Sequence, residues 1–283
     1  MPAERCRLAL AAFLWACDLE IRALKPGNVS DHAEGHGMRA EDFRISARVS
    51  APALGQLEQG VGERIYGAVK ATRAAVGCNT NLGILMLSAP LIEAFVTRAP
   101  EEPLASRLRT ILEQLGPDDA EWLFKAIALA QPGGLGTVSE GDVLSPPKIS
   151  IQAAMTLAME RDRIARQYVE GYRDIFRTGI PLYDSRLSIG DSEEWATAAV
   201  FLGLLSRFED SHVGRKFGWA CAQQVTQDAA KAARLFGPTS VKPELILRPL
   251  LDLDRKFKFR GINPGTTADL TVATLLAARL QAG

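Results

Sequence analysis

The stretch ERCRLALAAFLWACDLEIRAL, residues 4–24, indicates which kind of fold the chain adopts. Its apolar positions follow one another at spacings of four, three and four: Leu8, Ala12, Trp15 and Leu19. This spacing is one face of an α-helix. The sequence KPGN at 25–28 then ends the helix, because proline and glycine together disfavour its continuation. The stretch therefore predicts a long amphipathic helix followed by a glycine-containing junction.

Helical periodicity recurs along the rest of the chain. It predicts one or two helices over 40–75, with breaks near Pro52 and Gly60, and single helices over 82–96, 104–115, 118–130, 149–177, 191–213, 219–236, 243–251 and 267–281. In the long pattern at 149–177, the expected core contacts are Met155, Met159, Tyr168, Tyr172, Ile175 and Phe176. No alternating series of strands and no internal repeat interrupts the pattern. We therefore predict an all-α fold, a single multi-helix domain over residues 1–283, in which glycine-rich helix junctions form the site.

The charge and cysteine content narrow the class of protein. Lys and Arg together number 33, as do Asp and Glu, so no net charge attracts the chain to nucleic acid or to an anionic membrane. No stretch approaches the roughly 20 apolar residues of a membrane span. The four cysteines are far apart, which favours a reduced, cytoplasmic setting. An export signal at the N-terminus is the alternative, but Glu4 and Trp15 argue against it.

The first junction, residues 20–38, contains a carboxylate on an apolar helix stripe. Glu20 shares that stripe with Phe13, Cys17 and Leu24. A buried carboxylate must be paired, bound to a metal or neutral; a hydrogen bond from a neighbouring loop amide is the alternative here. His32 and His36 are four residues apart, as two zinc ligands on a helix would be. The glycines between and after them indicate a loop instead, and no third soft ligand lies nearby.

Three further junctions combine glycine with polar groups. GCNTNLG at 77–83 sets polar side chains in front of an apolar helix, and EDSHVGRK at 209–216 ends a helix with charged groups. PGGLG at 132–136 could cradle a phosphate or be a plain connector. In NPGTTAD at 263–269, Asp269 lies near the start of the last predicted helix, where capping that helix is an alternative to a catalytic role.

Taken in order, these motifs resemble the triphosphoribosyl-dephospho-CoA synthase family. The matching segments run through nearly the whole chain: a glutamate followed by Lys25-Pro26-Gly27; His36-Gly37-Met38 for GAH-x-DM; Gly77 to Gly83 for GVNTHKG; Asp210 to Arg215 for DTNV-x-x-RG; and Pro264 to Leu270 for SPGGSADL. The resemblance implies an all-helical transferase that uses ATP as a substrate. In that reaction a hydroxyl of dephospho-CoA attacks the ATP ribose, adenine leaves, and the triphosphate stays on the transferred ribose.

The resemblance also implies roles for individual residues. It assigns acid, base or Mg²⁺-ligand roles to three carboxylates: Glu20, Asp210 and Asp269. It assigns substrate contacts to a second group: Lys25, Gly27, His36, Asn79, Thr80, Gly83, Arg215, Lys216 and Gly265. Within that group we expect Lys25 and Arg215 to bind the triphosphate, because arginine offers bidentate contacts and lysine a point charge.

The sequence departs from the family pattern inside the motifs. Asn81-Leu82 replaces His-Lys, Gly37 replaces an acidic residue, and Lys216 follows Arg215 where the family has glycine. These changes favour, as one alternative, a different acceptor or nucleotide in the synthesis of another coenzyme, for example a one-carbon cofactor of the methanopterin or methanofuran type. A non-catalytic nucleotide-binding or scaffold protein is the second alternative. The expected partners are small-molecule substrates, either ATP with dephospho-CoA or another coenzyme precursor; a homodimer is left open.

Overall fold

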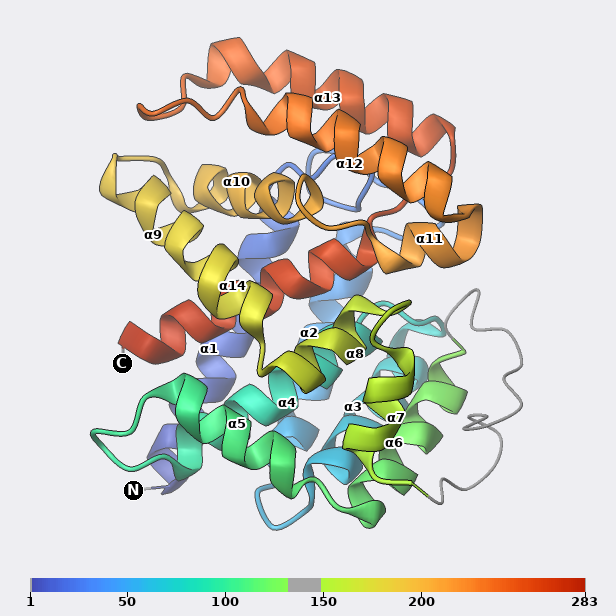
Figure 1. The fold of residues 1–283 in the computed structure, drawn as a ribbon, viewed down its shortest axis with the longest axis vertical. Coiled ribbons are helices and arrows are strands. Elements are labelled where there is room, and N and C mark those ends of the chain that lie inside the picture. The colour runs from blue at the N-terminus through green and yellow to red at the C-terminus, as the bar shows by residue number, and fades with distance from the viewer. Residues whose placement is uncertain (1, 132–148, 283) are drawn as a thin grey trace.

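The structure, a computed structural model, describes residues 2–131 and 149–282. Over these residues the chain is helical, without β-strands (Figure 1). The helices in order are α1 (Pro2–Arg22), α2 (Ala40–Leu54), α3 (Val61–Val76), α4 (Leu82–Thr97), α5 (Leu104–Gln114), α6 (Pro117–Ala130), α7 (Ile151–Ala158), α8 (Arg163–Glu170), the π-helix η1 (Ile175–Gly179), α9 (Ile180–Ser188), α10 (Glu193–Leu205), α11 (Ser211–Phe217), α12 (Trp219–Ala233), α13 (Pro243–Phe259) and α14 (Gly265–Ala282). The predicted all-α fold is confirmed, as a single helical domain.

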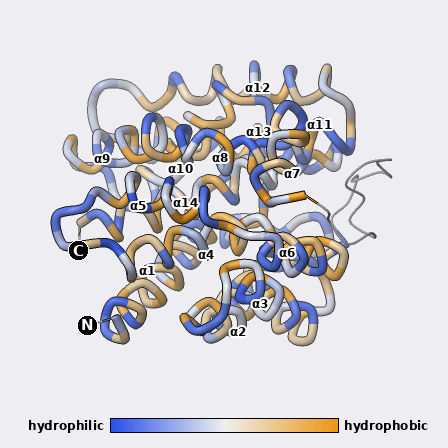
Figure 2. The backbone as a smooth tube through the Cα atoms, turned by 60° about the horizontal axis from the view of Figure 1, so that its bottom comes forward, coloured by the Kyte–Doolittle hydropathy of each residue, from blue (hydrophilic) through white to orange (hydrophobic). Residues whose placement is uncertain are grey.

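Helices α1, α4 and α14 form the centre of the molecule. Helix α14 packs against α1, α4 and α10, and most residues of α4 and α14 are buried. A second, smaller apolar cluster lies between α10, α12 and α13, which Figure 1 shows as a layer at one end of the molecule. Outer helices such as α3 and α12 alternate between hydrophilic and hydrophobic residues along the tube in Figure 2. This alternation is the pattern of helices that bury one face and expose the other.

A proline inside α4 explains how α8 is fixed against it. Pro90 has no N–H, so the Met86 carbonyl one turn earlier loses its usual helical partner. The Tyr168 hydroxyl donates to that carbonyl at 2.6 Å, and the Tyr172 hydroxyl donates to the Leu87 carbonyl at 3.1 Å. Both tyrosines are buried, as predicted. These bonds satisfy the carbonyls and hold α8 beside α4, where the cavity described below is formed.

Three predicted helices are wrong in extent: α13 runs to Phe259, beyond the predicted end at residue 251, and two long patterns each contain more than one helix. The pattern at 149–177 is not one helix, because Gly171 adopts a left-handed conformation with φ of 62° and ends α8. The pattern at 191–213 is also two helices, α10 and α11, with a new N-terminus at Asp210. In both cases an aspartate begins a helix inside a stretch that was read as continuous. Of the six expected core contacts in the first pattern, Met159 and Phe176 are only partly buried.

Helix α1 exists as predicted, but the predicted apolar face is buried only in part. Ala12 and Leu19 are buried, whereas Leu8 is 54% exposed. The neighbouring stripe of Phe13, Cys17 and Glu20 is buried as well. The consequence is that the Glu20 carboxylate points into the protein. No helix in the described part of the chain is long and apolar enough to cross a membrane.

Candidate functional site

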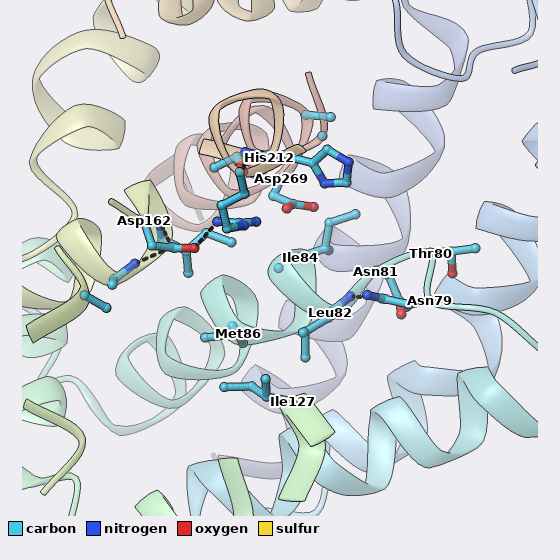
Figure 3. Close-up of a pocket in the computed structure, with 18 of the residues that line it drawn as sticks. Asn79, Thr80, Asn81, Leu82, Ile84, Met86, Ile127, Asp162, His212 and Asp269 are labelled. Atoms are coloured by element: carbon cyan, nitrogen blue, oxygen red, sulfur yellow. Dashed lines mark hydrogen bonds and ion pairs between the residues drawn. The ribbon is translucent and has the colours of Figure 1, made fainter. Parts of the chain in front are cut away.

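A cavity of about 380 Å³ lies where the N-terminal ends of α4, α8 and α14 converge. A volume of this size suits a small-molecule ligand. In Figure 3, Asp162 lies at one side of the cavity, Asn79 and Thr80 at the other, and Asp269 and His212 between them. Seven of the residues predicted for the site line the cavity: Glu20, Asn79, Thr80, Gly83, Arg215, Gly265 and Asp269. The predicted junctions therefore meet, although they are far apart in sequence.

The start of α4 gives the cavity a positive end. The backbone N–H groups of Gly83 and Ile84 donate to no acceptor among the described residues, as is usual in the first turn of a helix. Unpaired N–H groups and the helix dipole favour an anion or a partial negative charge at this point. The carboxylate of Asp269 lies directly over this helix end.

Gly83 is what allows Asp269 to approach α4 so closely. A Cβ atom at position 83 would lie 2.1 Å from Asp269 Oδ2 and 2.6 Å from Ile164 Cδ1, so any residue larger than glycine would clash. The Asp269 side chain accepts no hydrogen bond from any described residue. The capping role considered for Asp269 is therefore wrong. Its carboxyl is held in place by packing and faces the cavity.

The Asp269 carboxyl lies in a strongly acidic environment. Burial raises its pKa well above the ordinary value, and the negative charges of Asp210, Glu20 and Asp162 raise the pKa further. Arg215 opposes this effect only weakly. A carboxyl with a raised pKa can take up and release a proton at a pH closer to neutrality, which suits acid or base catalysis.

Glu20 and Lys25 form a buried ion pair at the wall of the cavity. Lys25 Nζ donates to Glu20 Oε1, to Asn28 Oδ1 at 2.9 Å and to the Val29 carbonyl at 2.9 Å. All three of its donors are thus used. Burial raises the pKa of Glu20 and lowers that of Lys25, while the attraction between the two opposes both shifts. Glu20 reaches the cavity and Lys25 does not, so the lysine holds the glutamate.

Asp210 lies behind the cavity and joins two helix ends. Its Oδ1 accepts from the Val213 N–H at 3.0 Å, which caps α11. Its Oδ2 accepts from both the N–H and the hydroxyl of Thr267 at 2.8 Å, in the first turn of α14. Asp210 is 2% exposed and does not line the cavity. Its geometry is that of a residue that fixes the position of the α14 end, where Asp269 lies.

The residues of the motif at the start of α4 also differ in role: some hold the helix in place and others border the cavity. Asn79 Oδ1 accepts from the Leu82 N–H at 3.1 Å and so caps the helix, while the residue still borders the cavity. The Thr80 hydroxyl is bonded to the Ser46 hydroxyl at 2.6 Å, which ties α4 to α2. Leu82, one of the two departures from the family pattern, lines the cavity as apolar surface.

Of the remaining predicted residues that the structure describes, Arg215 is the charged one that lines the cavity. It donates to Asp162 Oδ2 at 2.5 Å, and its Nε is buried without a partner among the described residues. Lys216 is exposed and does not line the cavity. His36 bonds the Gly27 carbonyl at 2.7 Å, and the Gly27 N–H donates to Asp254 at 2.8 Å. Both His36 and Gly27 therefore shape a loop away from the cavity. The predicted phosphate loop at 132–136 lies outside the described residues.

Sequence reasoning assigned no role to three charged or ionisable residues at the cavity. They are Arg161, Asp162 and His212. Asp162 caps α8 by accepting from the N–H groups of Ile164 and Ala165. The run ERDR at 160–163 could have signalled this break, because consecutive charges are unusual within a buried helical pattern. Burial lowers the pKa of the His212 imidazole; the negative charge of Asp210 opposes this shift, and the neighbouring cations Arg215 and Lys216 add to it.

A magnesium site of three protein ligands is not present in the described residues, where no group of three or more His, Cys, Asp or Glu side chains could hold a metal. Magnesium commonly uses one or two carboxylates and completes its shell with water and phosphate oxygens. Of the three predicted carboxylates, Asp210 has both oxygens engaged and Glu20 has one. Asp269 is the one that fits, because its oxygens accept no hydrogen bond from described residues and its neighbours are acidic.

The fold and the cavity define an all-helical enzyme with a nucleotide-sized site at converging helix N-termini. Residues 6–283 match the family described as ATP:dephospho-CoA triphosphoribosyl transferase, and the chain belongs to that family. It is thus a transferase that resembles triphosphoribosyl-dephospho-CoA synthase and uses ATP, as the sequence motifs predicted.

A solved structure supports the same assignment. It is a crystal structure from Archaeoglobus fulgidus, described provisionally as a triphosphoribosyl-dephospho-CoA synthase. The identity is 25% and the TM-score 0.63, and the match covers 82% of this chain and 96% of the other. A search of the curated proteins gave no significant match.

Proposed function

We propose that the cavity transfers the triphosphoribosyl group of ATP to an acceptor hydroxyl, and that dephospho-CoA is the first acceptor to test. The observation that carries this proposal is the position of Asp269. Its carboxyl faces the middle of the cavity, over the open N-terminal end of α4 and between the charged and the amide-bearing sides. Ribose occupies the middle of ATP in the same way, between the triphosphate and the base.

In the proposed step, the acceptor oxygen forms a bond to the anomeric carbon of the ribose while the glycosidic bond to adenine breaks. Asp269 takes the proton of the attacking hydroxyl, and the electron pair of the broken bond leaves with adenine. The proton that Asp269 has taken from the acceptor passes to adenine as it leaves, so that the protons balance, while Glu20, held as a carboxylate by Lys25, is a hydrogen-bond acceptor at that side of the cavity. A carboxylate near the ribose also stabilises the positive charge that develops there in the transition state.

The cations bordering the cavity suit the triphosphate. Arg215 donates to Asp162, Arg161 precedes Asp162 in the chain, and both arginines line the cavity. Arginine binds phosphate through two parallel hydrogen bonds, which holds the anion and orients it. Mg²⁺, when bound, would neutralise part of the triphosphate charge and could be held mainly by phosphate and water oxygens, which leaves Asp269 free to act as the base.

The apolar side of the cavity suits a reaction in which water must not replace the acceptor. Met86, Phe124 and Ile127 line this part together with Leu82. Apolar side chains beside the reactive ribosyl centre exclude water and so suppress hydrolysis of the activated sugar. Leu82 is one of the two departures from the family motif, so this wall is also where a different acceptor, such as another coenzyme precursor, would be selected.

The test measures the release of free adenine by chromatography. The purified protein is incubated with ATP, Mg²⁺ and dephospho-CoA, and in parallel with other hydroxyl-bearing coenzyme precursors. Asp269→Asn should abolish adenine release, whereas Asp252→Asn, on the exposed surface, should not. Adenine that appears only with another acceptor would transfer the proposal to that acceptor. No adenine with any acceptor would overturn it and favour a nucleotide-binding scaffold.

A further inference from the structure

The side chain of Asn81 is buried at the cavity without a hydrogen-bond partner. Asn81 is 5% exposed, and its Nδ2 is closed off from solvent and bonds to no described residue. Its Oδ1 likewise accepts no hydrogen bond from the described residues; only the backbone carbonyl of Asn81 is engaged, by the Leu85 N–H. A buried Nδ2 donor left without an acceptor costs free energy, whereas Oδ1 is not closed off in the same way. The cost at Nδ2 is removed when a ligand offers it an acceptor, and Oδ1 can then accept from a donor on the same ligand.

The surroundings of Asn81 form what we call the amide recess, bordered by Glu20, Phe43, Asn81 and Ile84. These four residues line the large cavity and also a second space of about 10 Å³ behind it, which is closed by Cys17, Ile21 and Ala47. Glu20 and Asn81 are the polar side chains of this second space, and the rest of its lining is apolar. The second space is too small for more than a water molecule. The part of the large cavity that these four residues border therefore suits an uncharged group with apolar faces and a polar edge.

A phosphate does not fit the amide recess. Lys25 is the cation bonded to Glu20, and all three of its donors are already used by Glu20, Asn28 and Val29. The arginines that line the cavity are Arg161, which precedes Asp162 in the chain, and Arg215, which donates to Asp162. Figure 3 shows Asp162 at the opposite side of the cavity from Asn81. The charge distribution thus orients a nucleotide with its phosphates toward the α8 and α11 side and its base toward the amide recess.

We propose that Asn81 binds the polar edge of adenine in the amide recess and so determines which base the donor nucleotide carries. An asparagine amide pairs with the amino group of adenine and the ring nitrogen beside it through two hydrogen bonds. Phe43 and Ile84 supply the apolar contacts for the faces of the ring. This inference rests on the proposed use of ATP, but it assigns the base end of the site to a residue at which the sequence departs from its family.

The experiment measures binding of nucleosides, so that it does not depend on turnover. Calorimetry compares adenosine with inosine, which carries an oxygen acceptor in place of the amino donor. The wild-type protein should bind adenosine about 10- to 100-fold more tightly, the discrimination expected of one amide pairing with a base edge. In Asn81→Ala the two nucleosides should bind equally. Asn81→Gln, which keeps the amide but displaces it, should give an intermediate preference.

Two results would overturn the assignment of Asn81. One is a wild-type protein that binds the two nucleosides equally or binds neither. The other is a preference for adenosine that survives in Asn81→Ala. Should the alanine variant not fold, the wild-type comparison and Asn81→Gln still decide the question. Adenine release by the wild type tests the reaction separately: release without any base preference refutes the role of Asn81 alone, and preference without release refutes the reaction alone.

Discussion

Replacing Gly83 by alanine tests the geometry of the site at its most crowded point. The added Cβ would lie 2.1 Å from Asp269 Oδ2 and 2.6 Å from Ile164 Cδ1. Unbonded carbon atoms rest about 3.5–4 Å apart, so the carboxyl must move by more than about 1 Å. The Asp269 side chain is short and its backbone is part of the buried helix α14, so it cannot turn away without leaving its place at the cavity.

The expected cost follows from two opposing effects. Overpacking of a filled site lowers the free energy of unfolding by about 1–3 kcal/mol, whereas the higher helix propensity of alanine raises it by up to about 1 kcal/mol. We therefore expect a net loss of about 1–2 kcal/mol in the free energy of unfolding, and a melting temperature lower by about 2–6 °C. Because catalytic groups displaced by about 1 Å lose roughly 100-fold in rate, adenine release should fall by about that factor.

Thermal melting and the adenine assay measure both effects. Gly237→Ala is the matched control, because a Cβ there meets no atom within 4 Å. Combining Gly83→Ala with Asp269→Ala removes the main clash, so most of the loss in melting temperature should disappear in that background. A Gly83→Ala protein with wild-type melting temperature and wild-type rate would refute the close contact between Gly83 and Asp269. So would an equal loss of stability in the presence and absence of the Asp269 side chain.

Three further changes separate the roles of the charged groups. Asp269→Asn should melt above the wild type at about pH 8: the raised pKa means that the folded protein holds this proton more tightly than the unfolded chain does, so ionisation opposes folding. The difference in melting temperature should shrink toward about pH 4, where an ordinary carboxyl group titrates. Melting curves measured across this pH range test it, and a difference that stays the same at every pH would contradict the prediction. Lys25→Met should lower the free energy of unfolding by about 3–5 kcal/mol, because it leaves the charge of Glu20 buried without its partner. Urea unfolding measures this loss. The double variant Lys25→Met/Glu20→Gln should recover much of it. Arg161→Ala should raise the KM for ATP several-fold with little change in melting temperature; an unchanged KM would exclude Arg161 from the triphosphate site.

The sequence was sufficient to predict the all-helical class and the convergence of distant junctions. Apolar periodicity marks helices wherever a buried face repeats, and glycine marks where chain segments approach closely, as at Gly83. It was less reliable for the orientation of helices about their own axes. Leu8 satisfies the spacing on α1 but is exposed, because spacing cannot tell which of two neighbouring stripes meets the rest of the protein.

The division between supporting and contacting residues could not be predicted, because it depends on tertiary contacts. Asp210 and Asp269 both belong to family-like motifs. The oxygens of Asp210 accept hydrogen bonds at two helix ends, whereas Asp269 faces the cavity. Lys25 resembles a phosphate ligand in sequence and is a buried partner of Glu20 in the structure. Apolar periodicity alone did not indicate the cap at Asp162, because the pattern there resembles one continuous helix and the charged run ERDR at 160–163 is the signal of the break.

The fate of the two ends of ATP tests the central claim most directly. ATP carrying one label in adenine and another in the terminal phosphate is incubated with the protein, Mg²⁺ and the acceptor, and the products are separated. Transfer of the triphosphoribosyl group predicts that the adenine label appears as free adenine while the terminal phosphate label moves onto the acceptor. Terminal phosphate released as inorganic phosphate, with adenine still attached to its ribose, would contradict it.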